Sequence, residues 1–514
     1  MPGSLVAIHA ETPTEPWKRG RENSVAFDPS RTNCRSPLAA IPLSPPQLRA
    51  NAPRVLFVTP EMGDFIKVGG LGDVSASLPR AMREIADVRV LLPGYPAVFS
   101  AGLVFETVGD MPATATLPAW KLLRGRASDG LVIYVAECPS MFAREGTPYG
   151  PHAGADFADN GQRFARLSLC AAEIAAGEAD PGWRPTILHA NDWPTAMSLA
   201  YARWKNAGIK GIFTIHNLAY QGLFDPGQLE PLAIPGAAYD VNGLEFHGKI
   251  SFVKAGIFYA SHVTTVSETY AHEITTKAMG CGLHGLLSDR ADEGRLTGIL
   301  NGLDEDWRDP QAGMSLMKWK KLHADEIRRK FRLSASSGPL FSIISRLVHQ
   351  KGIDLSLQAA ETIVENGGQL VVTGRGDPQF EKSIEQLAAR HKGAVAAHIG
   401  FDESEARRIF AASDFLLMPS RFEPCGLSQM YAQKSGALPI AFRTGGLADT
   451  IEHGRSGFLF SRCTSAALSR TVAKAMDMFK SERPAIQRMR RYATTRRYEW
   501  TSSARNYLEL YMAK

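Results

Sequence analysis

The 514-residue sequence lacks several features that mark specialised classes of protein. Its six cysteines include no CxxC pair, so no zinc site is indicated, and so few thiols are typical of a reduced intracellular protein. No run of about 18 apolar residues occurs, so no transmembrane helix is expected. The net charge of +6 comes from 58 basic and 52 acidic residues spread along the chain, whereas a nucleic-acid-binding surface needs clustered Lys and Arg.

Residues 1–50 differ in composition from the remainder of the chain. They are rich in Pro, Ser, Arg and Thr, and they contain no apolar core of a secretory signal peptide. A plastid transit peptide is also rich in Ser and Arg but is poor in acidic residues. This segment contains Glu11, Glu15, Glu22 and Asp28. We therefore expect a disordered tail on a cytoplasmic protein, with a plastid location as the alternative.

From residue 51 onward, short β-rich runs alternate with stretches of helical pattern. Near-continuous apolar strands separated by helices are typical of a parallel sheet that is covered on both faces. The runs of the first half are 55–59, 88–92, 131–136, 186–190, 211–215 and 262–266. After a polar region at roughly 304–339, a second set follows at 340–345, 369–373, 395–399, 414–418 and 438–442.

The two sets of runs predict an α/β protein with two Rossmann-like, doubly wound domains. Ligands of open α/β sheets bind at the carboxyl ends of the strands, so two such sheets are expected to share one cleft between the domains. We expect the first domain at 51–300, the second at 301–490 and a C-terminal helix that crosses back to the first domain at 491–514.

The stretch "IKVGGLGDV" (66–74) lies between the first strand and its helix. Its glycines allow the backbone to approach a ligand, and the helix N-terminus offers free N–H groups to an anion. Lys67 adds a full positive charge. The stretch matches neither the dinucleotide fingerprint nor the P-loop pattern. A phosphate-binding loop and a tight turn with a surface lysine therefore both remain open.

Three other loops carry chemically useful side chains after predicted strands. Arg346 and Lys351 of "SRLVHQKG" could clamp a diphosphate, with Arg giving bidentate contacts. Glu423 lies in a turn bounded by Pro and Gly, and a second glycine-rich loop, "RTGGLADT", follows the next strand. "HANDW" and "TIHNLAYQG" place polar residues at two further strand ends. For each of these a structural role is the alternative.

Together these stretches resemble the bacterial glycogen synthases and plant starch synthases. "KVGGLGDV" resembles the KxGGL signature of that family, and further blocks follow in the family order from about Val55 to Phe460. They include "LPGYP", "HANDW", "FTIHNLAYQG", "KAGIFYASHVTTVSETYAHEI", "GILNGLDEDW", "SRLVHQKG" and "PSRFEPCGLSQMYA". The resemblance implies a GT-B fold and glucose transfer from a nucleotide sugar, ADP-glucose rather than UDP-glucose, to an α-1,4-glucan.

The resemblance also implies roles for individual residues. The catalytic set would be Lys67, His216, Arg346, Lys351 and Glu423. Donor binding would involve Arg346 and Lys351 together with Gly69, Gly70, Gly445 and Gly446. The acceptor and glucose side would be lined by Asp73, Tyr149, Asp192 and Asn301.

Charge determines the expected mechanism. Cleavage of the anomeric C–O bond leaves negative charge on the diphosphate, which preorganised cations stabilise, so we expect no cofactor and no metal. The "DED" triplet (304–306) superficially resembles a metal-binding DxD motif, but it lies in the polar region between the domains. The family retains the α configuration, and because no nucleophile is identified we favour departure and attack on one face of the sugar.

Two positions differ from the family pattern: Glu268 stands where proline is usual, and His284 stands where Asp is common. Two other functions share features with the sequence. An α-glucan phosphorylase has the same architecture but is longer and carries pyridoxal phosphate, and none of its blocks is present. A catalytically silent glucan-binding protein would be expected to lose some of Lys67, Arg346, Lys351 and Glu423, all of which are present.

Overall fold

The computed structural model describes residues 52–152, 155–304, 314–400 and 402–513. The predicted tail at 1–50 lies outside these residues, as do Glu305 and Asp306 of the DED triplet. Of the described helices, none combines the length and the apolar character that crossing a membrane requires.

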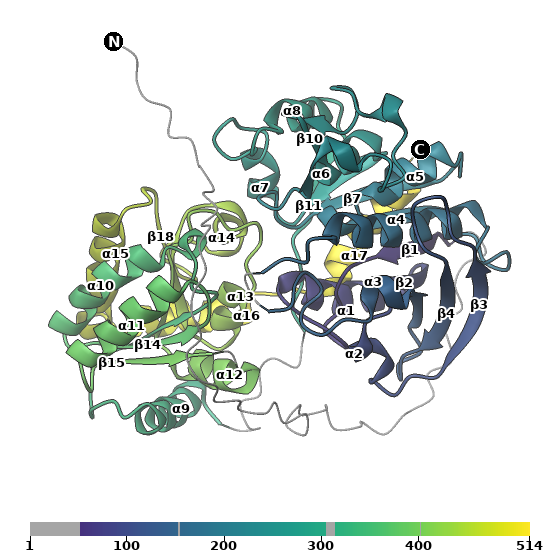
Figure 1. Ribbon diagram of the computed structural model, residues 1–514. Helices are drawn as coiled ribbons and strands as arrows, with labels where there is room; N and C mark the ends of the chain where they lie inside the picture. Colours follow the sequence, from purple (N-terminus) through teal and green to yellow (C-terminus); the bar gives the residue numbers. More distant parts are fainter. Residues whose placement is uncertain (1–51, 153–154, 305–313, 401, 514) are drawn as a thin grey trace, which may run out of the picture. The chain divides into compact units, whose positions relative to one another are not determined.

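The elements from β1 to β12, which we call the first lobe, contain a nine-stranded sheet (Figure 1). Its strand order is β12-β11-β7-β6-β1-β2-β5-β4-β3. The parallel strands are β1 (Arg54–Val58), β2 (Asp87–Pro93), β5 (Val132–Glu137), β6 (Ile187–Asn191), β7 (Lys210–Ile215), β11 (His262–Thr265) and β12 (Leu296–Gly298). A small sheet is formed by β8 (Leu223–Phe224), β10 (Lys249–Ser251) and β9 (Glu245–Phe246).

Two antiparallel strands extend one edge of the first sheet, and the sequence patterns did not indicate them. β4 (Trp120–Arg126) pairs antiparallel with β5, and β3 (Phe105–Met111) pairs antiparallel with β4. The connections between these strands are too short for the helical crossover that parallel neighbours need. Most of β3 is exposed or half-exposed, so its sequence contains no continuous apolar run.

The second lobe, from β13 to β18, contains six parallel strands in the order β15-β14-β13-β16-β17-β18. The strands are β13 (Leu340–Ile344), β14 (Gln369–Gly374), β15 (Val395–Ile399), β16 (Phe415–Met418), β17 (Leu438–Phe442) and β18 (Phe458–Phe460). Numbered from its first strand, this order is 3-2-1-4-5-6, the order of a dinucleotide-binding Rossmann sheet.

Helices cover both faces of the sheets. Those of the first lobe are α1 (Gly70–Met82), α2 (Pro96–Phe99), α3 (Pro139–Phe142), α4 (Asn160–Ala176), α5 (Met197–Trp204), α6 (Phe252–Tyr259), α7 (Glu268–Glu273) and α8 (His284–Asp292). The helices associated with the second sheet are α9 (Leu316–Lys330), α10 (Ile353–Glu365), α11 (Pro378–Arg390), α12 (Glu403–Ala412), α13 (Ser428–Lys434), α14 (Gly445–Thr450), α15 (Ser465–Ser481) and α16 (Arg483–Thr495).

Alternate residues of the central strand β13 enter different hydrophobic cores. Phe341 and Ile343 pack in one core, and Leu340 and Ile344 pack in the other. Because successive strand side chains point to opposite faces, a run of consecutive apolar residues fits a strand covered on both faces.

The C-terminal segment contains a break that the predicted helix at 491–514 did not include. α16 ends at Thr495, and α17 (Trp500–Met512) begins five residues later. Between them the Tyr498 hydroxyl donates to the Gln433 side-chain oxygen at 2.5 Å and to the Thr450 carbonyl at 3.1 Å, which holds this segment out of the helix. α17 packs against α1 of the first lobe, and the domain boundaries themselves remain predictions.

Each sheet has one point at which its strand order reverses. In the first sheet, β2 and β6 lie on opposite sides of β1, and in the second, β14 and β16 lie on opposite sides of β13. The loops that follow the central strands at such a point open a crevice at the carboxyl edge of the sheet, where ligands bind. The loops that follow β1, β6, β13 and β16 are therefore the first places to look for a site.

Candidate active site

The loop after β1 carries Lys67 and leads into α1. The Lys67 ammonium pairs with the Asp73 carboxylate in the first turn of that helix, at 2.6 Å. Gly69 is the N-cap of α1 and provides no side-chain cap, so the first N–H groups of the helix have no capping side chain. The sequence therefore positions an uncapped helix N-terminus and a lysine side by side, which is the local structure of an anion site.

Asp192, directly after β6, is held in a strained backbone conformation. Its φ of 61° and ψ of 177° fall in a region that residues other than glycine rarely occupy. Its Oδ1 atom is buried without a hydrogen-bond partner among the described residues. Burial raises the pKa of this carboxyl to about 7, and nearby backbone N–H groups of Asn217 and His216 offset part of that effect. The chain thus holds an unpartnered acceptor at the switch point of the first sheet.

His216, after β7, lies beside the same loop. Its Nε2 is 3.1 Å from Oδ1 of Asn191, whose amide nitrogen donates to the Val58 carbonyl, so His216 donates to Asn191. Burial lowers the pKa of His216 to about 3, so the ring stays neutral at physiological pH. His189 has a different role: its ring is fully buried and hydrogen-bonded to Tyr511 and Thr214, which is a structural arrangement.

Glu61 is the main site residue that sequence reasoning missed. It is 3% exposed, and one carboxylate oxygen accepts the N–H groups of Val68 at 2.6 Å and Gly69 at 3.3 Å. The other oxygen accepts the hydroxyl of Tyr149 at 2.9 Å. The sequence does not mark this glutamate, because two of its partners are backbone N–H groups and the third, Tyr149, lies 88 residues away in the chain.

In the second lobe, Lys351 and Glu423 come together from the loops after β13 and β16. The Lys351 ammonium is 2.5 Å from the Glu423 carboxylate, and the Ser420 hydroxyl donates to the same oxygen at 3.0 Å. Both side chains are mostly buried. The pair was predicted as two separate site residues, and the structure shows that each is the other's partner.

Arg346, in the same loop as Lys351, contacts only neutral groups among the described residues. Its guanidinium donates to the Tyr220 hydroxyl at 3.2 Å and weakly to the Gln350 amide oxygen at 3.4 Å. Because Tyr220 belongs to the first lobe, this bond also connects the two lobes. Arg346 is exposed, so its planar fork is open to an anionic ligand.

Gly445 and Gly446 begin α14, where the chain passes close to the Glu423 loop. A Cβ atom at either position would lie 2.0 Å from a carbonyl of that loop, so only glycine fits without a shift. The Gly445 N–H and the Thr444 hydroxyl both donate to Glu273 of α7, at 3.1 and 2.8 Å. These glycines thus have a packing role, and their contact with the donor stays a prediction.

Asn301 is buried beside Cys425. Burial raises the pKa of the Cys425 thiol to about 12, while hydrogen bonding from Asn301 offsets part of that rise. Glu268, at the position where the family usually has proline, is the first residue of α7. That position suits proline and also suits an acidic side chain, which explains why the departure is tolerated.

Lys67, Asp73 and Asp192 follow strands at the switch point of the first sheet, and Arg346, Lys351 and Glu423 follow strands at that of the second, whereas His216, Asn301, Gly445 and Gly446 follow β7, β12 and β17. The two lobes also contact one another. The Ser267 hydroxyl donates to the Pro424 carbonyl at 2.6 Å. The Leu427 side chain lies 3.9 Å from where a Cβ of residue 70 would stand. Among the described residues, no hydrogen bond or ion pair joins Lys67 to Lys351, Glu423 or Arg346.

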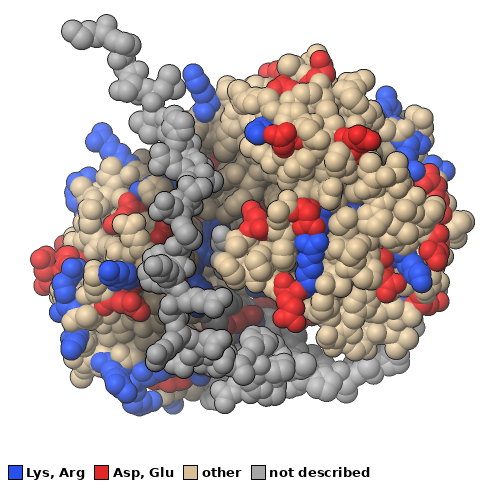
Figure 2. Space-filling view, in the orientation of Figure 1, with Lys and Arg blue, Asp and Glu red and all other residues tan. Residues whose placement is uncertain are grey.

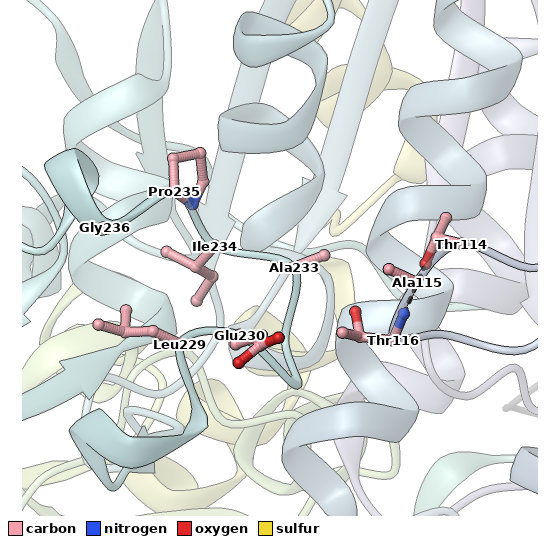
Figure 3. Close-up of a pocket in the computed structure, with 9 residues that line it drawn as sticks. All are labelled: Thr114, Ala115, Thr116, Leu229, Glu230, Ala233, Ile234, Pro235 and Gly236. Carbon is pink, nitrogen blue, oxygen red and sulfur yellow. Dashed lines mark hydrogen bonds between the residues drawn. The ribbon is translucent and has the colours of Figure 1, made fainter.

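A separate pocket of about 470 Å³ opens on the first lobe, and it contains none of the predicted residues (Figure 3). Its walls are the 114–116 segment and the 229–236 segment, and Glu230 is its one charged side chain. Lys and Arg side chains are interspersed with Asp and Glu over the face shown in Figure 2.

Comparison with known proteins identifies the family. A family model described as the starch synthase catalytic domain matches residues 54–289, and another described as glycosyl transferases group 1 matches residues 324–496. The glycogen synthase of Pseudomonas syringae pv. syringae is 50% identical over 471 residues, which cover 90% of this chain and 97% of that protein. The chain belongs to the glycogen synthase and starch synthase family.

Two further comparisons support this family assignment. Glycogen synthase 1 of Bradyrhizobium diazoefficiens is 50% identical over 458 residues, covering 88% of this chain and 99% of that protein. The solved catalytic domain of starch synthase IV from Arabidopsis thaliana, bound to ADP and acarbose, has a TM-score of 0.79 and 30% identity. That comparison covers 90% of this chain and 99% of the solved chain. The predictions of a GT-B fold and of a glucosyltransferase of glycogen or starch synthesis are confirmed.

Proposed function

We propose that this protein transfers glucose from ADP-glucose to the non-reducing end of an α-1,4-glucan such as glycogen, with retention of the α configuration. One observation carries the proposal. Cations and carboxylates stand at the switch points of both sheets, in a chain that is 50% identical to a glycogen synthase over 90% of its length.

The cations would act on the diphosphate. As the anomeric C–O bond breaks, negative charge grows on the leaving ADP, and preorganised positive groups lower the energy of that state. Arg346 would bind two phosphate oxygens through its fork. Lys351 and Lys67 would contribute point charges, and the uncapped N-terminus of α1 would add backbone N–H groups.

The carboxylates would hold the sugar. Glu423 is fixed by Lys351 and Ser420, so it can accept a glucose hydroxyl without reorganising. Asp192 has a buried oxygen that no described group satisfies, and a sugar hydroxyl would satisfy it. His216, which stays neutral, would line the same surface. The leaving group and the acceptor would occupy one face of the sugar.

The identity of the donor nucleotide is the most specific part of the proposal. The starch synthase IV structure contains ADP, and at 30% identity over almost the whole chain it supports an adenine nucleotide here. Incubation of the purified protein with glycogen and either ADP-[14C]glucose or UDP-[14C]glucose tests this. We expect labelled polymer from ADP-glucose, at a rate at least about tenfold higher than from UDP-glucose. No incorporation from either donor would refute the proposal.

We also propose that transfer needs no divalent metal, because protein cations neutralise the diphosphate. The same assay in excess EDTA should give an unchanged rate. A rate that falls with EDTA and returns with Mg²⁺ would contradict this part and leave the donor assignment intact.

A further inference from the structure

Glu61 connects three segments that the proposed function uses. It follows β1 and is almost fully buried. Its backbone is fixed from one side, because the Thr59 hydroxyl donates to the Glu61 carbonyl at 2.8 Å. Its carboxylate oxygens accept three further hydrogen bonds, from Val68, Gly69 and Tyr149, so the side chain is held by protein groups alone.

One carboxylate oxygen holds the Lys67 loop. Oε2 accepts from the N–H groups of Val68 and Gly69, the two residues between Lys67 and the first residue of α1. Charge-assisted bonds to backbone N–H groups are among the stronger hydrogen bonds in proteins. They fix the direction in which the loop leaves the sheet, and with it the positions of Lys67 and the α1 N-terminus.

The other carboxylate oxygen holds Tyr149, whose ring packs against a second aromatic side chain. Oε1 accepts the Tyr149 hydroxyl at 2.9 Å, and the Tyr149 ring packs against Trp193 with centroids 6.4 Å apart. Trp193 is the next residue after Asp192. One buried carboxylate thus sets the distance between the Lys67 loop, Tyr149 and the Asp192 segment.

We propose that Glu61 is a positioning residue for glucosyl transfer, which holds the Lys67–Gly70 loop and Tyr149 at fixed positions relative to each other. This inference rests on the proposed function. Glu61 does not need to touch the donor. It acts because a displacement of about 1 Å in a group that binds the reacting phosphates can cost roughly 100-fold in rate.

The chemistry of the side chain predicts how substitutions will rank. Glu61→Ala removes both acceptors and frees the loop and the tyrosine together. Glu61→Gln keeps one oxygen for the Val68 and Gly69 N–H groups, and its amide nitrogen can donate to the Tyr149 oxygen, which accepts as readily as it donates. The glutamine variant should therefore preserve the relative positions of the loop and Tyr149 without the negative charge.

Two readouts test the proposal, and the first is independent of activity. Hydrogen exchange of the 62–75 peptide should be at least about tenfold faster in Glu61→Ala than in wild type, and near wild type in Glu61→Gln. Unchanged exchange in Glu61→Ala overturns the proposal, whether or not the wild type transfers glucose from ADP-glucose. A wild type that does not transfer glucose refutes the proposed function alone.

The second readout is transfer from ADP-glucose. Glu61→Ala should lose about 30-fold or more in kcat/KM, and Glu61→Gln should stay within about threefold of wild type. Glu173→Gln is the matched control, since Glu173 is an equally buried carboxylate of the same lobe that accepts from Trp120 and Arg166. It should lower Tm and leave kcat/KM within about twofold. A Glu61→Gln enzyme as impaired as Glu61→Ala, or a Glu61→Ala enzyme with wild-type kcat/KM, would overturn the positioning role.

Discussion

The two lobes each present a lysine paired with a carboxylate, and the two pairs differ in burial. In the second lobe the side chains of Lys351 and Glu423 are 16% and 7% exposed. In the first lobe those of Lys67 and Asp73 are 33% and 28% exposed. The N–O distances are nearly equal, at 2.5 and 2.6 Å. The difference therefore lies in the surroundings of the pairs and not in their geometry.

Burial determines what each pair can do. A buried charge that loses its partner remains uncompensated in a medium of low dielectric constant, whereas an exposed pair contributes little because water screens it. The second lobe thus holds a preformed set of groups around Glu423. The first lobe presents a lysine that can exchange Asp73 for a stronger anion, such as a diphosphate, at small cost.

The largest effect is expected from removing one member of the buried pair. Glu423→Ala would leave the Lys351 ammonium buried and unpaired and would remove the proposed sugar contact. We expect kcat/KM to fall by about 1,000-fold and stability to fall by about 3 kcal/mol. Radiolabelled transfer and denaturant unfolding measure the two effects. If Asp73→Ala lost as much stability as Glu423→Ala, the contrast in burial would have no energetic meaning.

Removing Arg346 should have the next largest effect, which we expect on the use of the donor and not on stability. Because Arg346 has no carboxylate partner among the described residues, its truncation leaves no buried charge behind. We expect a loss of about 100-fold in kcat/KM with Tm unchanged. Arg346→Lys restores the charge without the fork and should recover only part of that loss. Full recovery by lysine would show that the planar geometry is not used.

A smaller effect is expected at Lys67. Lys67→Ala removes one screened charge from the donor site, and we expect a loss of about tenfold in kcat/KM with little change in Tm. Steady-state kinetics with ADP-glucose, compared with Lys351→Ala, make the measurement. A loss in kcat/KM at Lys67 larger than that at Lys351 would contradict the proposal that the second lobe contributes more to donor use than the first.

The smallest effect is a pH-dependent one at Asp192. Burial raises the pKa of this carboxyl to about 7, above its value in the unfolded chain, so the ionised form destabilises the fold. Stability should therefore fall as the pH rises from about 4 to about 7 and then level off. Asp192→Asn should raise Tm by about 2–5 °C at pH 8 and by almost nothing at pH 4. An equal shift at both pH values would show that ionisation of Asp192 is not the cause.

Sequence patterns predicted the buried framework well and the edges poorly. The runs 340–345 and 438–442 match β13 and β17 to within one residue, because strands covered on both faces read as continuous apolar segments. β3 and β18 were missed, the first because it is mostly exposed and the second because it is short. The break before α17 depends on the buried hydroxyl of Tyr498, whose partners lie far away in the chain.

The site residues likewise divide into those that the sequence predicts and those that only the structure shows. Residues in the loops that follow strands, such as Lys67 and Glu423, follow from the rule that ligands of open α/β sheets bind at the carboxyl ends of strands. The pairing of Lys351 with Glu423 joins positions 72 residues apart, which no local pattern specifies. Glu61 was missed because two of its partners are backbone N–H groups of its own loop, which no side-chain pattern reveals, and the third, Tyr149, lies 88 residues away. Sequence predicts which loops form the site, and the structure shows which side chains hold one another.

Equilibrium binding of ADP tests the central contrast between the lobes most directly. Isothermal titration of ADP into wild type, Arg346→Ala and Lys67→Ala enzymes separates donor affinity from turnover. The account predicts that Arg346→Ala weakens binding by at least about tenfold, because a bidentate charge-assisted contact is lost, and that Lys67→Ala stays within about threefold. Equal or stronger weakening in Lys67→Ala would contradict the assignment of donor affinity to the second lobe.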